Sequence, residues 1–239
     1  MTVRHHHLFF WPATFFPNHC KISVDMNNLK ISLVIPVKNE AESIGQLLET
    51  IFSQTKLPDE VVITDGGSTD STTAIVQNYI DRGLPIKLIK TPGAFPGRGR
   101  NLAIQQVSND LIALTDAGVT LDKFWLEKLT APFVRDPDCQ ISYGAFVPVT
   151  DNIFQKCVAL VFVPFQAVAS AGLSYGLVPF VASLAFKKQL WFDVGGFRED
   201  LRSHEDTVFF NDLTKLKQKF CCAPGAVVYW NQRRHFRDV

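Results

Sequence analysis

The stretch ISLVIPVKNEAESIGQLLETIF, residues 31–52, decides the fold of this chain. It opens with an apolar, β-rich run that a proline closes, which predicts a buried strand at residues 31–36. Apolar residues then recur at positions 44, 47, 48, 51 and 52, the spacing of an amphipathic helix. A buried strand followed at once by a helix is the repeating unit of an α/β sheet.

The strand–helix unit repeats further along the chain. Apolar runs predict strands at residues 60–65, 86–89 and 110–115, with an amphipathic helix between each pair. Strands that alternate with helices at this short spacing form parallel sheets with right-handed crossovers. We therefore expect an α/β, Rossmann-like fold in which helices flank a mostly parallel central sheet. Further elements are predicted near residues 122–133 and 209–216 (helices) and near 141–147, 219–222 and 226–230 (strands).

The bulk composition limits the classes of protein to which the chain can belong. Its 239 residues are 46% hydrophobic, and 24 basic against 23 acidic residues leave a net charge of +1. This balance is typical neither of nucleic-acid-binding nor of disordered proteins, so no nucleic-acid partner is expected. Residues 1–28, where prolines interrupt a short apolar run, are expected to be a poorly ordered extension rather than a signal peptide. Residues 29–239 are expected to form one domain.

The cysteines do not form a recognisable pattern. Five occur, at positions 20, 139, 157, 221 and 222, and none belongs to a CxxC pair. An odd number without metal-ligand spacing indicates a protein of a reducing compartment.

Polar residues follow three of the predicted strands. The segment from Pro36 to Glu40 follows the first strand, Asp65 ends the second, and Asp116 follows the fourth. Ligands of parallel α/β sheets bind beyond the carboxyl ends of the strands. The sequence therefore predicts that these residues gather at one edge of the sheet and form a binding site there.

Four segments carry a family resemblance. They are VIPVKNEAESI (34–44), ITDGGSTDST (63–72), RGRNLAIQQVSNDLIALTDAG (98–118) and VGGFREDLRSHEDTVFF (194–210). In this order and spacing they resemble the family 2 glycosyltransferases over about residues 31–230. The resemblance implies the GT-A fold, with a donor half at about residues 29–120 and an acceptor half at about 121–230.

The resemblance also implies a site for a nucleotide-sugar donor. The end of the first strand and Asp65 would hold the nucleotide base, since a carboxylate can accept a hydrogen bond from a ring N–H. Arg100 matches an arginine that lies near the base or the diphosphate. The implied donor-binding residues are Pro36, Val37, Asn39, Glu40, Asp65, Gly67, Arg100, Asp116 and Ala117.

Asp116 matches the first residue of the family's Asp-x-Asp motif, which implies a divalent cation, Mg²⁺ or Mn²⁺, between protein and diphosphate. The second carboxylate is missing, because position 118 is glycine. Asp116 is therefore expected either to bind the metal, directly or through water, or to contact the ribose. His235 is a further candidate metal ligand, on the looser resemblance to a late histidine of some GT-A enzymes.

Asp206 matches the general base of the family, which takes the proton of the acceptor hydroxyl in an inverting transfer. Glu205 is adjacent and is the alternative for that role. The tight turn of Gly195, Gly196 and Phe197 is expected to line the acceptor site, where Trp191 would stack on a sugar or belong to the core.

Residues 157–186 contain no charged side chain, a length that could span a bilayer. A single crossing would put Asp116 and Asp206 on opposite sides of the membrane, and Pro164 and Pro179 interrupt any helix. A peripheral membrane contact through about residues 153–186, or an apolar lining for a lipid-linked acceptor, fits better than a span. Ordinary core and loop is the alternative interpretation of the stretch.

The sequence thus predicts an inverting glycosyltransferase that uses a UDP- or GDP-sugar, a divalent cation and a carbohydrate or lipid-linked acceptor. The expected location is the cytoplasm, at the inner face of the cell membrane. Two alternatives stay open. A non-catalytic homologue that binds nucleotide-sugars would also fit the missing carboxylate. A nucleotidyltransferase fits less well, because the segment after the first strand lacks a glycine-rich phosphate loop.

Overall fold

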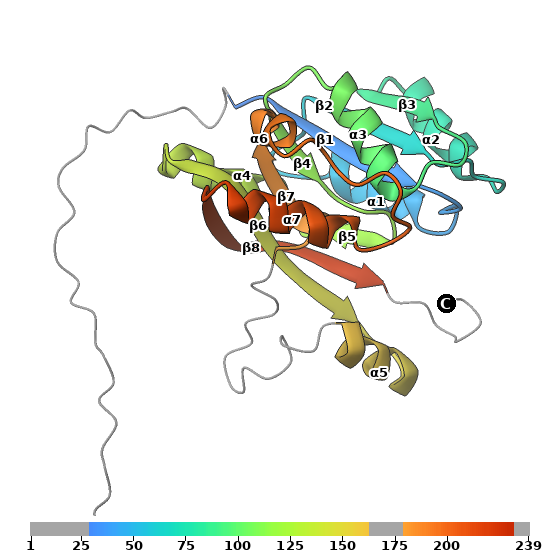
Figure 1. The fold of residues 1–239 in the computed structure, drawn as a ribbon. Coiled ribbons are helices and arrows are strands. Elements are labelled where there is room, and N and C mark those ends of the chain that lie inside the picture. Colours follow the sequence, from blue (N-terminus) through green and yellow to red (C-terminus); the bar gives the residue numbers. More distant parts are fainter. Residues whose placement is uncertain (1–28, 163–178, 232–239) are drawn as a thin grey trace, which may run out of the picture.

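The structure, a computed structural model, describes residues 29–162 and 179–231. The expected N-terminal extension and His235 lie outside these residues. One eight-stranded sheet, with the strand order β3-β2-β1-β4-β7-β6-β8-β5, forms the centre of the molecule (Figure 1). The strands are β1 (Ile31–Val37), β2 (Glu60–Asp65), β3 (Ile86–Lys90), β4 (Leu111–Leu114), β5 (Val119–Leu121), β6 (Cys139–Val149), β7 (Leu184–Lys187) and β8 (Lys219–Asn231).

Helices cover both faces of the sheet, except for one at the end of β6 that extends away from it. They are α1 (Ile44–Phe52), α2 (Thr72–Asp81), α3 (Pro96–Gln106), α4 (Trp125–Arg135), α5 (Ile153–Phe162), α6 (Lys188–Asp193) and α7 (Glu205–Lys215), with a short 3₁₀ turn at Val181–Ser183. Strands β3, β2, β1 and β4 are parallel. The expected α/β fold with a mostly parallel sheet is confirmed, although β7 is antiparallel to both of its neighbours and β5 is antiparallel to β8.

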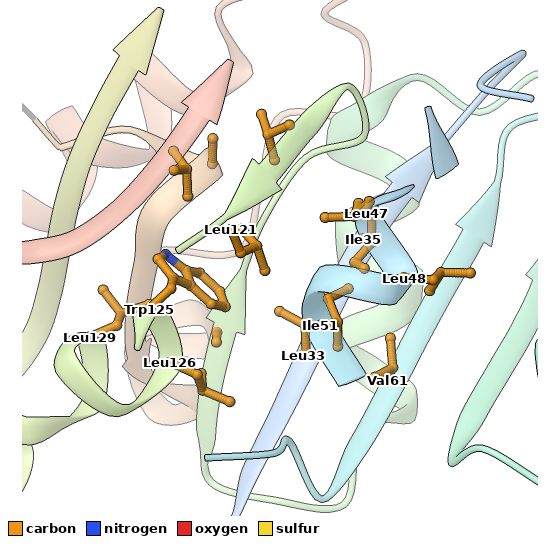
Figure 2. Packing of buried hydrophobic residues seen from close by; sticks show 14 of the residues in the cluster. Leu33, Ile35, Leu47, Leu48, Ile51, Val61, Leu121, Trp125, Leu126 and Leu129 are labelled. Atoms are coloured by element: carbon orange, nitrogen blue, oxygen red, sulfur yellow. The ribbon is translucent and has the colours of Figure 1, made fainter. Parts of the chain in front are cut away.

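Alternation along β1 explains the two layers of helices. Successive side chains of a strand point to opposite faces. Leu33 and Ile35 belong to a core cluster with α1, α2 and α4, whereas Val34 belongs to a second cluster with α3, α6 and α7. Figure 2 shows the first of these clusters, where Leu47 and Ile51 of α1 lie over the β1 side chains.

Strand β4 joins the donor half to the acceptor half. It pairs with β1 on one side and with β7 on the other. β7 was not predicted, because all of it except Lys187 lies within the uncharged stretch, where period-2 alternation is absent. It is buried along most of its length, and strands buried on both faces read as continuous apolar runs. The two short strands predicted after residue 218 are one long strand, β8.

Neighbouring strands also bring two cysteines together. Cys139 of β6 and Cys221 of β8 form a disulfide with a Cα–Cα distance of 6.1 Å, whereas Cys157 and Cys222 are free and exposed. The expectation of reduced cysteines is therefore wrong for this pair. Residues 82 positions apart give no spacing signal, and only the β6–β8 pairing places them side by side.

The predicted membrane-contacting stretch is only partly described. Helix α5 extends away from the sheet at the end of β6 (Figure 1), and Ile153 at its start is 76% exposed. No helix in the described residues is long and apolar enough to cross a membrane. Residues 163–178 of the uncharged stretch lie outside the described part of the chain.

Candidate functional site

A pocket of about 450 Å³ opens at the carboxyl edge of the parallel strands. The ends of β1, β2 and β4 form one side, and the start of α3 together with the loop before α7 forms the other. Its lining consists of Pro36, Val37, Lys38, Glu40, Thr64, Gly66, Thr91, Ala94, Phe95, Pro96, Gly99, Arg100, Asp116, Ala117, Val181, Arg202, Ser203, His204, Glu205 and Asp206.

Arg100 joins the two sides of this pocket. Its side chain is 3% exposed, and its two terminal nitrogens form ion pairs with Asp116 (2.5 Å) and with Glu205. Burial by itself disfavours the guanidinium charge, but the two carboxylates outweigh that effect and raise the pKa of Arg100 above its usual value. Arg100 therefore stays charged and fixes one carboxylate from each half of the chain.

The two adjacent acidic residues at the start of α7 differ in their surroundings. Glu205 is buried and paired with Arg100. Asp206 lines the pocket, forms no ion pair with any described residue, and accepts a hydrogen bond only from Thr207. His204 before them has a left-handed backbone, with φ at 66°. Asp206 is therefore the carboxylate that is available to a ligand.

Asp116 follows β4 and leaves a third of its side chain exposed. Gly118 is left-handed, with φ at +80°, and a Cβ there would have only Glu40 Oε2 nearby, at 3.9 Å. The carboxylate of Glu40 thus borders the space in which the missing second carboxylate would lie. The described residues contain no cluster of three or more acidic, histidine or cysteine side chains that could hold a metal by themselves.

The nine predicted donor-binding residues fall into two groups. Six line the pocket, and Asn39, Asp65 and Gly67 do not. Asp65 is buried and accepts hydrogen bonds from the N–H groups of Gly67 and Ser68. Asn39 links the β1 and β2 loops, since its N–H donates to Ser68 Oγ at 2.8 Å. These three residues hold the loops beside the pocket in place.

The four predicted acceptor residues belong to α6 and to the turn that follows it. Gly195 and Gly196 do form a tight turn, with φ at 79° and 81°, but none of the four residues lines the pocket. Trp191 and Phe197 are buried, and both donate hydrogen bonds to Asn101 Oδ1, through the indole N–H and the backbone N–H. Of the two positions expected for Trp191, the structure shows the one in the core. These residues anchor the loop that leads to Asp206.

Sequence reasoning missed several lining residues that come from loops. Among them are Phe95, which precedes α3, and Arg202, which precedes α7. The guanidinium carbon of Arg202 lies 5.4 Å from the centre of the Phe95 ring. The contact joins loops more than 100 residues apart, so no local spacing could reveal it. The basic residues Arg233 and Arg234, candidate phosphate ligands, lie outside the described residues.

The sequence matches a family model described as glycosyl transferase family 2. The match covers residues 32–168, which is more than half of the 239 residues. The chain belongs to this family. The family resemblance noted in the sequence is thereby confirmed, and the first three of its four segments lie within the matched residues.

Curated relatives of this family 2 chain include TarS of Staphylococcus aureus, named a poly(ribitol-phosphate) β-N-acetylglucosaminyltransferase. It is 25% identical over 187 residues, which cover 76% of this chain and 32% of TarS. The lipopolysaccharide core biosynthesis glycosyltransferase LpsC of Rhizobium meliloti is 36% identical over 101 residues, 42% of this chain and 36% of LpsC. The chain thus spans about a third of the length of these relatives.

Solved structures of similar fold include TarS residues 1–349 in complex with UDP-GlcNAc, with a TM-score of 0.67 and 24% identity over 87% of this chain and 60% of that one. The mannosyltransferase PcManGT from Pyrobaculum calidifontis, in complex with GDP-Man and Mn²⁺, gives a TM-score of 0.65 and 20% identity over 89% of this chain and 60% of that one. The GT-A fold expected for the family 2 chain is therefore confirmed.

Proposed function

We propose that this family 2 domain transfers a sugar from a UDP- or GDP-linked donor to an acceptor hydroxyl, with inversion at the anomeric carbon. One observation carries the proposal: a single pocket contains Asp116 at a strand end and Asp206 on the opposite side, and Arg100 ties the two sides together. The complexes of similar fold with UDP-GlcNAc and with GDP-Man support this choice of donor.

In the proposed reaction Asp206 acts as general base. It accepts the proton of the acceptor hydroxyl while that oxygen attacks the anomeric carbon and the bond to the diphosphate breaks. Glu205 does not compete for this role, because its carboxylate is buried against Arg100. Instead, the Arg100–Glu205 pair positions the start of α7 and thereby holds Asp206 toward the pocket.

The carboxylate oxygens of the pocket fit a divalent cation that enters together with the nucleotide-sugar. Mg²⁺ and Mn²⁺ prefer carboxylate and phosphate oxygens and are commonly held by one or two carboxylates plus substrate phosphates. Asp116 and Glu40 are the two residues that would hold the ion. A bound cation would neutralise charge on the departing diphosphate. His235 remains a candidate for this site.

We further propose that the acceptor is a cell-envelope glycan or a lipid-linked precursor, used in the cytoplasm at the inner face of the membrane. Support comes from the relatives TarS and LpsC, whose names concern poly(ribitol-phosphate) and lipopolysaccharide core. The exposed apolar start of α5 is compatible with a peripheral membrane contact.

A panel of UDP- and GDP-sugars tests the proposal. Release of nucleoside diphosphate would be measured with Mn²⁺, Mg²⁺ or EDTA, in the wild-type protein and in Asp206→Asn. We expect turnover of at least one donor that is lost in the variant. Nucleotide binding without turnover in any combination would point to a non-catalytic homologue, and turnover unaffected by EDTA would rule out the metal.

A further inference from the structure

Four arginines lie in α3 and in the loop before α7, and three of them have acidic partners. Arg98 pairs with Glu199 at 4.0 Å, Arg100 with two carboxylates, and Arg198 with both oxygens of Asp200 at 2.7–2.8 Å. The fourth, Arg202, has no carboxylate within ion-pair distance among the described residues, although it lines the pocket.

The guanidinium of Arg202 is held by contact with an aromatic ring rather than by a carboxylate. Its central carbon lies 5.4 Å from the centre of the Phe95 ring, a cation–π geometry. The N–H donors of this guanidinium have no hydrogen-bond or ion-pair partner among the described residues, so they are available to a ligand. Those donors match two oxygens of one phosphate, which is the recognition for which arginine is suited.

The charge balance of the pocket indicates a role for the guanidinium of Arg202. Arg100 cannot neutralise a diphosphate, because Asp116 and Glu205 already compensate its single charge. The position of the second carboxylate in the Asp-x-Asp motif is Gly118, so the motif itself supplies one carboxylate where two are usual. Lys38 also lines the pocket, but its amine has no ion pair or aromatic-ring contact with another described residue.

We propose that Arg202 binds the diphosphate of the donor and stabilises it as the leaving group. This inference rests on the proposed function and extends it. As the acceptor oxygen bonds to the anomeric carbon, the electron pair of the breaking C–O bond moves onto the diphosphate oxygen. Arg202 donates hydrogen bonds to that developing charge, while the acceptor proton goes to Asp206.

Equilibrium binding in EDTA tests the role of Arg202 without turnover. UDP, GDP, inorganic pyrophosphate and the nucleosides uridine and guanosine would be titrated into wild type and Arg202→Gln by calorimetry. We expect the variant to bind its nucleoside diphosphate and pyrophosphate at least about tenfold more weakly, as for a lost hydrogen bond to a charged group. Nucleoside affinity should not change.

Arg198→Gln is the matched control, because it removes the same charge from the same loop but from an arginine whose donors are already paired. It should bind like the wild type, and Arg202→Lys should recover part of the lost affinity. Equal affinities of wild type and Arg202→Gln for the diphosphates would overturn the proposal. So would equal losses in the two glutamine variants, or a wild type that binds no diphosphate.

The donor panel separates this inference from the proposed function. Turnover by the wild type with an unchanged kcat/KM in Arg202→Gln would contradict the role of Arg202 but support the proposed glycosyl transfer. Pyrophosphate binding that depends on Arg202, without turnover of any nucleotide-sugar, would contradict the proposed glycosyl transfer but support the diphosphate site at Arg202.

Discussion

Glu205 and Asp206 are adjacent in sequence, yet the fold gives them different surroundings. Glu205 is buried against Arg100, whereas Asp206 faces the pocket. If Asp206 is the base, Asp206→Asn should lower kcat by about 10²–10⁴-fold, the usual contribution of a positioned general base. Nucleotide affinity should stay within about twofold, since the base acts on the acceptor side. A variant with near-normal kcat would exclude Asp206 as the base.

Glu205 should matter for stability as well as for activity. Glu205→Ala leaves Arg100 buried with one carboxylate fewer, and breaking a buried ion pair costs about 3 kcal/mol or more. Urea denaturation followed by circular dichroism would measure this loss. Glu205→Gln keeps a hydrogen-bond acceptor for Arg100 and should lose less. If the two variants are equally stable, Arg100 does not depend on Glu205.

Gly118, which replaces the second carboxylate of the motif, also has an unusual backbone conformation. Its φ of +80° lies in the left-handed region, which costs residues other than glycine about 1–2 kcal/mol. Gly118→Ala should therefore lower the free energy of unfolding by about 1 kcal/mol. Gly118→Asn should cost less, because asparagine tolerates this conformation better. Chemical denaturation of both variants would check the order, and an alanine variant as stable as the asparagine variant would contradict it.

At the scale of elements, α3 positions the loop that leads to Asp206. A Cβ added at Gly97 would overlap the backbone carbonyl of Arg198, so this helix approaches the loop more closely than any side chain permits. We expect Gly97→Ala to destabilise the protein by about 1–3 kcal/mol, as overpacking does, and to reduce kcat by displacing the loop. Thermal unfolding and steady-state kinetics would measure both effects.

Gly45 is the matched control for Gly97, because it also lies within a helix. A Cβ at Gly45 would meet its nearest atom, in Ile75, at an ordinary 3.9 Å. Gly45→Ala should therefore stabilise the protein by about 0.5 kcal/mol through helix propensity alone. If both alanine variants are stabilised, the close approach of α3 to the loop is not a constraint.

The helices and strands also show which parts of the structure could be predicted from the sequence. Strands β1, β2 and β4 and helix α1 were predictable, because their apolar periodicity is local and their polar ends mark the site. β7 was not, because a strand buried on both faces carries no alternation. Phe95 and Arg202 could not be found either, since their contact depends on how α3 and α7 pack. The sequence did not decide whether Trp191 belongs to the core or stacks on a sugar, because periodicity does not distinguish a buried indole from one in a pocket.

At the scale of the whole molecule, the donor and acceptor halves should not fold separately. β4 ends the donor half but pairs with β7 of the acceptor half, and the cluster around Phe186 and Trp191 contains residues of both. A fragment of residues 29–120 would expose one edge of β4 and the apolar face of α3, two features that a stable domain must cover.

We therefore expect the full chain to unfold in urea in a single transition. Tryptophan fluorescence, to which Trp125 and Trp191 contribute from opposite faces of the sheet, should give the same midpoint as far-ultraviolet circular dichroism. The fragment of residues 29–120 should show no cooperative transition. Two separate transitions in the full chain, or a folded fragment, would mean that the halves are independent. Arg100 would then join two domains across the pocket, rather than two parts of one cooperative core.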